Sequence, residues 1–234
     1  MSAAQNAVFH HGSFRLGTYL VADSASTAGR PLPEVVAAAV AGGVDMVQLR
    51  CKDVPARDFL ALVLATARHT AGRAALIVND RVDVFLAARD AGAVVDGMHI
   101  GQSDLPADAV RRLIGPAAIL GLSASRTAQF EAVAALPEGT VSYLGTGAVR
   151  PTPTKKDHPE PLGFEGLAAL TARAPLPCVA IGGLAHGDAA AVHAAGAAGM
   201  AIVRAVCAAG DPEAAARSLA AEWAAVTHPG EASA

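Results

Sequence analysis

The stretch AALIVNDRVDVFLAARDAGAVVDGMHIG, residues 74–101, contains the unit from which the fold of the whole chain can be predicted. An apolar run over residues 74–80 is followed by apolar residues at helical spacing over 83–91, and another apolar run covers 97–100. Strands that are apolar throughout are buried on both faces, and helical crossovers between them require parallel pairing. The stretch therefore predicts a strand–helix–strand unit of a parallel sheet.

The same unit recurs along the chain. Strands are expected at residues 14–22, 46–50, 74–80, 97–100, 119–123, 143–147, 178–183 and 200–205. Alanine-rich segments with helical spacing lie between them, for example at 32–41, 59–70, 83–91 and 189–195. Prolines stand at or near helix starts, at Pro31, Pro55, Pro106 and Pro212. Eight β-α repeats in 234 residues predict an α/β fold, a single (β/α)8 TIM barrel.

An open, doubly wound sheet is the alternative fold. Such a sheet carries a glycine-rich dinucleotide turn after its first strand, whereas residues 22–25 here contain no glycine. The only related pattern is a lone GxG at Gly145 and Gly147, with Arg150 where the third glycine would stand. The closed barrel is therefore expected over residues 13–226, between a flexible segment, 1–12, and a flexible tail, 227–234.

The composition excludes several classes of partner. Hydrophobic residues make up 53% of the chain and charged residues 17%, and the net charge of −3 is spread without a basic stripe, so nucleic acid is not an expected partner. No uninterrupted apolar run is long enough for a signal peptide or a membrane span, and the three cysteines form no CxxC pair. We expect a cytoplasmic protein, and a homodimer is compatible with the sequence.

The second expected strand ends in three polar side chains at alternating positions. Gln48, Arg50 and Lys52 lie on one side of an extended chain, facing the mouth of a barrel. Two cations and an amide suit an anion. For this segment alone, an equally good interpretation is that the strand end reaches solvent and carries solvated charges.

One carboxylate follows each of the next two strands, at Asp80 and Asp104. Magnesium takes oxygen ligands and commonly uses one or two carboxylates with the phosphate oxygens of a substrate, so the pair predicts a Mg²⁺ site. Each aspartate alone could instead cap the helix that it precedes. His99 is expected to be a packed strand residue with a hydrogen bond.

The later strands end in a second group of polar features. Ser123 ends the fifth strand, and a polar loop with two prolines and two lysines begins at Pro151. The seventh strand ends in Gly182 and Gly183, where many barrels bind phosphate on backbone amides. The cations and aspartates near strands two to four form one expected anion site, and these later features form a second. Two anion sites predict two small phosphorylated substrates.

Together these motifs resemble the thiamine-phosphate synthase family, over about residues 19–207. The motifs are Gln48-Leu49-Arg50-x-Lys52, Asn79-Asp80-Arg81, His99-Ile100-Gly101-Gln102-x-Asp104, Pro151-Thr152-x-Thr154-Lys155 and Ala180-Ile181-Gly182-Gly183. The resemblance implies a transferase that joins 4-amino-2-methyl-5-(diphosphomethyl)pyrimidine to a thiazole phosphate, giving thiamine phosphate and pyrophosphate.

The resemblance also assigns roles to residues. The pyrimidine diphosphate would be bound by Gln48, Leu49, Arg50, Cys51, Lys52, Asn79, Ser123 and Lys155, and Mg²⁺ by Asp80 and Asp104. Arg50, Lys52, Ser123 and Lys155 would be catalytic. The thiazole phosphate would be bound by Thr152, Pro153, Thr154, Gly183, and the main chain at Val203 and Arg204.

Three residues depart from the family pattern: Cys51, Arg150 and Arg204 stand where an acidic residue, an apolar residue and a serine are usual. These three residues bear on the shape of the thiazole-phosphate site, and with it on the choice between the carboxylated and non-carboxylated thiazole. Two other functions fit part of the pattern: a thiazole tautomerase, which needs neither the paired aspartates nor the three cations, and a non-catalytic barrel that senses a phosphorylated metabolite.

Overall fold

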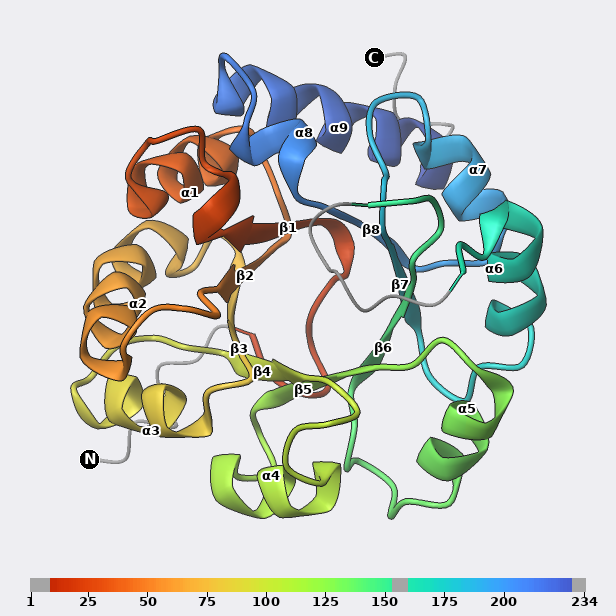
Figure 1. Cartoon of the computed structure of the whole chain (residues 1–234), viewed down its shortest axis with the longest axis horizontal. Coiled ribbons are helices and arrows are strands. Elements are labelled where there is room, and N and C mark those ends of the chain that lie inside the picture. The colour runs from red at the N-terminus through yellow and green to blue at the C-terminus, as the bar shows by residue number, and fades with distance from the viewer. Residues whose placement is uncertain (1–8, 153–159, 229–234) are drawn as a thin grey trace.

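The computed structural model describes residues 9–152 and 160–228, and eight parallel strands close into one barrel in chain order, with β8 paired to β1 (Figure 1). The strands are β1 (Gly17–Asp23), β2 (Met46–Arg50), β3 (Ala75–Asn79), β4 (Gly97–Ile100), β5 (Ile119–Ser123), β6 (Tyr143–Gly147), β7 (Cys178–Ile181) and β8 (Gly199–Ile202). The predicted (β/α)8 barrel is confirmed.

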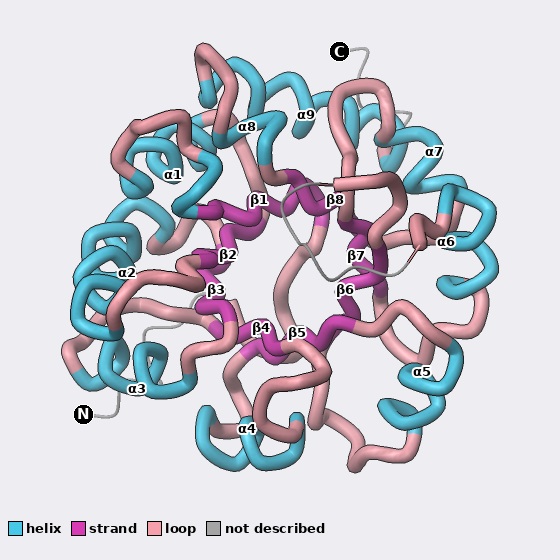
Figure 2. The backbone as a smooth tube through the Cα atoms, viewed as in Figure 1, coloured by secondary structure: helices cyan, strands magenta, loops and turns pink. Residues whose placement is uncertain are grey.

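The helices form a ring outside the strands (Figure 2). They are α1 (Leu32–Ala41), α2 (Ala56–Thr70), α3 (Val82–Asp90), α4 (Ala107–Ile114), α5 (Thr127–Ala134), α6 (Gly163–Thr171), α7 (Ala189–Ala194), α8 (Arg204–Cys207) and α9 (Pro212–Thr227), with a 3-10 turn η2 (Ser24–Ser26) after β1. Pro31, Pro55 and Pro106 precede α1, α2 and α4, and Pro212 opens α9, where a missing N–H costs no helical hydrogen bond.

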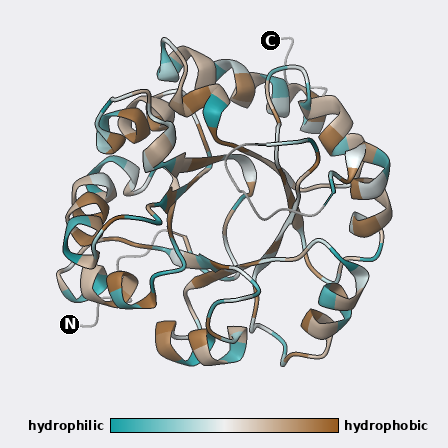
Figure 3. Ribbon diagram, in the orientation of Figure 1, coloured by the Kyte–Doolittle hydropathy of each residue, from teal (hydrophilic) through white to brown (hydrophobic). Residues whose placement is uncertain are grey.

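Side chains of each strand alternate between two apolar layers. Leu20 and Leu49 belong to the layer between strands and helices, whereas Tyr19, Met46 and Tyr143 belong to the barrel interior. Figure 3 shows the hydrophobic segments along the strands and on the surrounding helices. This alternation decides which of the predicted site residues can point toward the mouth of the barrel.

Four predicted strands differ from the observed ones at their ends, for local backbone reasons. Gly17 has a φ of 42°, so β1 begins there and not at residue 14. Asp80 (φ 62°) ends β3, and Gly182 (φ 105°) ends β7, because a left-handed residue leaves the extended conformation. Val203, with φ −114° and ψ −85°, separates β8 from α8. The other four strands, at 46–50, 97–100, 119–123 and 143–147, have the predicted bounds.

Residues 9–13 lie at the end of the barrel where the strands begin. Phe9 packs against the interior cluster, and His11 Nδ1 lies 2.7 Å from Ser142 Oγ. A cavity of about 470 Å³ opens beside this segment, lined in part by Phe14 and Trp223. Within 9–152 and 160–228, no helix combines the length and the apolar character needed to cross a membrane.

Candidate active site

The polar residues at the end of β2 occupy the positions that the period of two predicts, up to the strand's last residue. Gln48 is 5% exposed and points into the barrel, where its Nε2 donates to Tyr19 OH at 2.7 Å. Arg50 donates to the buried carboxylate of Asp23, at the end of β1. Lys52 lies beyond the strand, half exposed, with Nζ 3.8 Å from Asp80 Oδ2. Of the two cations described here, Arg50 is held in place and Lys52 extends toward the carboxylates.

Leu49 and Cys51 have side chains that face away from the barrel mouth. Both are buried in the layer between strands and helices, with exposures of 0% and 4%. Only their main chain can contact a ligand at the mouth. The departure at Cys51 therefore replaces an acidic residue by a small thiol that packs against helices, and burial raises its pKa to about 11.

Asp80 and Asp104 come together at the ends of β3 and β4. Burial, followed by the charge and hydrogen bonding of Asp104, raises the pKa of Asp80 to about 6, while Lys52 and Asn79 act in the opposite direction. Neither aspartate caps a helix: Arg81 and Pro106 are the N-cap residues of α3 and α4, and both helices lack a side-chain cap. The capping interpretation is wrong for both residues.

This pair of carboxylates fits a hard divalent cation. Two close carboxylates repel unless a proton or a cation lies between them, and this repulsion adds to burial, the larger cause, in raising the pKa of Asp80. In the described part of the chain, no group of three or more His, Cys, Asp or Glu residues could enclose a metal. A cation at Asp80 and Asp104 would need further oxygens from water or substrate, which is how Mg²⁺ is commonly bound.

A chain of hydrogen bonds crosses the barrel interior below these charged groups. Gln48 contacts Tyr19, Tyr19 OH lies 2.7 Å from Tyr143 OH, and Tyr143 OH lies 3.0 Å from His99 Nδ1. His99 Nε2 lies 2.9 Å from Ser123 Oγ, at the end of β5. His99 is thus the packed, hydrogen-bonded strand residue that the sequence predicts, and it connects Ser123 to Gln48.

Two glycines leave space for the rings of Tyr143 and His99 in this series of hydrogen bonds. A Cβ at Gly121 would lie 2.2 Å from Tyr143 Cζ and 2.4 Å from His99 Nδ1, and one at Gly145 would lie 3.0 Å from His99 Cε1. Gly145 belongs to the lone GxG pattern. Its role is to leave space in the barrel interior.

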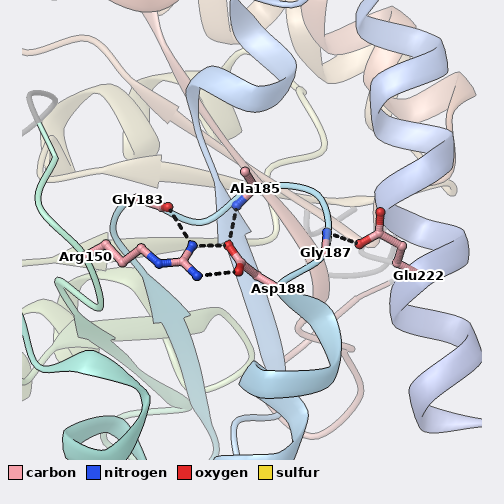
Figure 4. A network of polar contacts seen from close by, with 6 residues as sticks. All are labelled: Arg150, Gly183, Ala185, Gly187, Asp188 and Glu222. Atoms are coloured by element: carbon pink, nitrogen blue, oxygen red, sulfur yellow. Dashed lines mark hydrogen bonds and ion pairs between the residues drawn. The ribbon is translucent and has the colours of Figure 1, made fainter.

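Across the mouth, the glycine turn Gly182–Gly183 follows β7. Gly183 has a φ of 67°, and a Cβ there would lie 2.7 Å from Arg150 Cβ. Arg150 holds this turn: its Nη1 and Nη2 donate to Asp188 at 2.5 and 2.7 Å, and Nη1 also lies 3.4 Å from Gly183 O (Figure 4). Asp188 Oδ2 accepts from Ala185 N at 2.9 Å as well. Arg150, which departs from the family pattern, therefore forms a bidentate ion pair with Asp188 that fixes the loop between β7 and α7.

The remaining predicted residues of the thiazole-phosphate site lie partly outside the described residues. Val203 packs against the interior cluster, and Arg204 is exposed at the first position of α8. Thr152 is the last residue described before the gap, while Pro153, Thr154 and Lys155 fall within it.

Several residues that hold the site together are not among those predicted from the sequence. Asp23 carries a usable signal, because it ends the first apolar run as Asn79 ends the third. Tyr19 and Tyr143 read as ordinary strand residues, and Asp188 lies 38 residues from Arg150 with no motif around it.

Comparison with known proteins gives a consistent relationship. The thiamine monophosphate synthase family profile matches residues 18–206. A thiamine-phosphate synthase of Roseiflexus sp. (strain RS-1) is 46% identical over 203 residues, covering 86% of this chain and 82% of the relative. One from Psychrobacter sp. (strain PRwf-1) is 42% identical over 207 residues, covering 88% and 95%.

Among solved structures, thiamine phosphate pyrophosphorylase from Pyrococcus furiosus superposes with a TM-score of 0.78 at 29% identity, covering 90% of this chain and 96% of that one. The family profile includes all eight strands except Gly17, the first residue of β1. The chain belongs to the thiamine monophosphate synthase family.

Proposed function

We propose that this barrel joins 4-amino-2-methyl-5-(diphosphomethyl)pyrimidine to 4-methyl-5-(2-phosphoethyl)thiazole, or its carboxylated form, and releases thiamine phosphate and pyrophosphate. The observation that carries the proposal is the paired carboxylates Asp80 and Asp104 with Lys52 beside them, opposite a fixed glycine turn after β7. A diphosphate and a monophosphate need two separate anion sites, and these two features supply them. Membership of the family makes the chain a transferase.

The diphosphate would lie at the ends of β2 to β4. Arg50 and Lys52 would neutralise its charge together with Lys155, and Asn79 would orient it. The contact with Asp23 supports charge neutralisation by Arg50. The buried Asp23 carboxylate fixes the guanidinium, and the Arg50 side chain remains 18% exposed. When bound at Asp80 and Asp104, Mg²⁺ would neutralise part of the charge that develops on the departing pyrophosphate.

The reaction needs positioning and charge neutralisation but no side-chain nucleophile. The bond between the methylene carbon and the diphosphate oxygen breaks, and its electron pair leaves with pyrophosphate, whose charge Arg50, Lys52 and Lys155 stabilise. The thiazole nitrogen then forms a bond to the methylene carbon with its own lone pair. Gln48 and Ser123 hold the pyrimidine ring so that the nitrogen lies in line.

The thiazole phosphate would lie near β6 to β8. We assign its contacts to Thr152, Pro153, Thr154, Gly183 and the main chain at Val203 and Arg204. The left-handed conformation of Gly183 and its restraint by Arg150 support a backbone contact to phosphate there. The side chain of Arg204 is exposed and would add only a partly solvated charge.

The two rival functions differ in what they consume. A thiazole tautomerase would isomerise the thiazole phosphate without a pyrimidine diphosphate, and a sensor would bind phosphorylated ligands without turnover. The close approach of Asp80 and Asp104 favours neither, because only a diphosphate with its cation requires both carboxylates.

A crystal structure with pyrophosphate and Mg²⁺ soaked in tests the assignment of the first site. We expect the cation between Asp80 and Asp104, and pyrophosphate in contact with Arg50 and Lys52. Pyrophosphate at the glycine turn, with no cation near the aspartates, would contradict it. Isomerisation of the thiazole phosphate by the protein alone would indicate the tautomerase instead.

A further inference from the structure

We propose that the hydrogen-bond chain across the barrel has one fixed polarity, which makes Ser123 a hydrogen-bond donor and Gln48 Oε1 an acceptor toward the substrate ring. Tyr19, Tyr143 and His99 would then be positioning residues that set the preference for an aminopyrimidine over its oxo counterpart. The identity of the ligand rests on the proposed function, whereas the polarity of the hydrogen bonds does not depend on it.

The polarity starts at Gln48, because an amide nitrogen can donate a hydrogen bond but cannot accept one. Gln48 Nε2 donates to Tyr19 OH at 2.7 Å. In the described part of the chain the Tyr19 hydroxyl has two hydrogen-bond partners, the donor Gln48 Nε2 and Tyr143 OH, so Tyr143 OH, 2.7 Å away, is the acceptor for the Tyr19 proton. Tyr143 in turn donates to His99 Nδ1 at 3.0 Å.

A proton donated to Nδ1 fixes the tautomer of a neutral imidazole. Nδ1 of His99 is then the acceptor, and Nε2 carries the ring proton and donates to Ser123 Oγ at 2.9 Å. The Ser123 hydroxyl receives this bond, so its own proton is available to a group at the mouth. At the other end of the chain, Gln48 uses its nitrogen and keeps its carbonyl oxygen for the ligand.

Burial makes the arrangement of protons hard to change. Tyr19 and Tyr143 are 1% and 0% exposed, and burial raises the pKa of both phenols, so both remain neutral O–H groups. Reversing one member would leave a buried hydroxyl proton facing another donor, which is costly in the barrel interior. The packing of Tyr143 and His99 against Gly121 and Gly145 keeps the rings at these distances.

The consequence is a ring-binding edge with an acceptor on β2 and a donor on β5. An aminopyrimidine has the complementary pattern: its exocyclic amine donates, and its ring nitrogens accept. The 4-oxo counterpart presents a carbonyl in place of the amine, so it would face the oxygen of Gln48. Sites built to pair such groups reject analogues that leave a polar atom unmatched.

The first test measures the tautomer of His99 directly, with no need for activity. Long-range ¹H–¹⁵N correlation spectra of ¹⁵N-histidine-labelled protein at neutral pH distinguish the two tautomers and the cation, and His99→Gln assigns the signals. We expect His99 to carry its proton on Nε2. A proton on Nδ1, or on both nitrogens, would overturn the proposed polarity even if the protein is an active synthase.

The second test compares two variants in the same strand region. Tyr143→Phe keeps the ring and removes the hydroxyl, whereas Ser142→Ala removes a buried hydroxyl that bonds to His11 and to Leu120 N at the other end of the barrel. We expect Tyr143→Phe to populate the second tautomer of His99 and to lower the kcat/KM preference for the amino over the oxo diphosphate by about tenfold, the worth of one hydrogen bond. Ser142→Ala should change neither. An unchanged tautomer and preference in folded Tyr143→Phe would overturn the role of the tyrosine.

Discussion

Replacing Arg150 by alanine should loosen the glycine turn after β7 and weaken binding of the thiazole phosphate. The variant leaves the Asp188 carboxylate, whose side chain is 9% exposed, with only the Ala185 N–H of its three donors. Breaking a fully buried ion pair costs about 3–5 kcal/mol, and an exposed pair contributes about 0–1 kcal/mol. Arg150 is 44% exposed, so we expect a loss of about 2 kcal/mol.

The effect on binding follows from the contact between Arg150 Nη1 and Gly183 O, at 3.4 Å. Without it the turn samples other conformations, and only part of them can bind phosphate. We expect KM for the thiazole phosphate to rise about tenfold with kcat nearly unchanged, since the lost interaction is the same in the ground and transition states.

The assays are urea unfolding and steady-state kinetics with the thiazole phosphate varied. Arg150 also stacks over the Phe164 ring, so a double-mutant cycle with Asp188→Asn isolates the ion pair from that contact. Arg217→Ala is the matched control, because it removes an exposed i,i+4 pair with Glu213 on α9 and should cost less than about 0.5 kcal/mol. If Arg150→Ala costs no more than this control and leaves KM unchanged, the ion pair does not restrain the turn.

Further predictions concern the two proposed anion sites. Asp80→Asn should lower kcat by about a hundredfold, with thiazole phosphate binding unchanged, because it removes one preorganised charge from the diphosphate site; a variant that kept kcat and lost thiazole affinity would refute the two-site assignment. The Asp80 pKa of about 6 in the folded chain lies above its value of about 3.9 in an unfolded chain, so the folded chain retains a proton that the unfolded chain releases. In EDTA, the part of the unfolding free energy due to Asp80 should therefore fall by up to about 2 kcal/mol as pH rises from about 4 to 6. Urea unfolding at several pH values should show this fall in the unmodified protein and not in Asp80→Asn. Parallel pH profiles of the two proteins would contradict the raised pKa of Asp80. Lys155→Ala should lower kcat by about a hundredfold in the same kinetic assay, and an unchanged kcat would remove Lys155 from the diphosphate site. Gly183→Val should raise KM for thiazole phosphate far more than Arg204→Ser, whose effect should be a few fold at about 1 kcal/mol or less; equal losses would make the arginine side chain the anchor.

The eight-strand barrel could be predicted because each strand is a short apolar run separated from the next by a helical segment. Strand ends were harder, since single backbone conformations decide them. Phe14 and Leu16 precede the strand, yet they are apolar and pack in the barrel interior as strand residues do. The amino-acid sequence before Gly17 therefore does not indicate where β1 begins. The positive φ of Asp80 is likewise set by its tertiary surroundings, including the bond from its N–H to His99 O.

The site could be predicted where its residues are close in sequence. Alternation places Gln48 and Arg50 inside and buries Leu49, but it does not apply to Lys52, which lies beyond the end of β2. Contacts between distant strands could not be predicted, because barrel closure alone brings them together. Tyr19 and Tyr143 are 124 residues apart and meet at 2.7 Å.

The most direct test of the proposed two-site reaction is to count products. Purified protein is incubated with the pyrimidine diphosphate, the thiazole phosphate and Mg²⁺, and thiamine phosphate and pyrophosphate are quantified in the same samples. We expect the two products in a one-to-one ratio, with neither formed when either substrate is omitted. No thiamine phosphate above a no-enzyme control, or pyrophosphate released without it, would contradict the reaction proposed for this barrel.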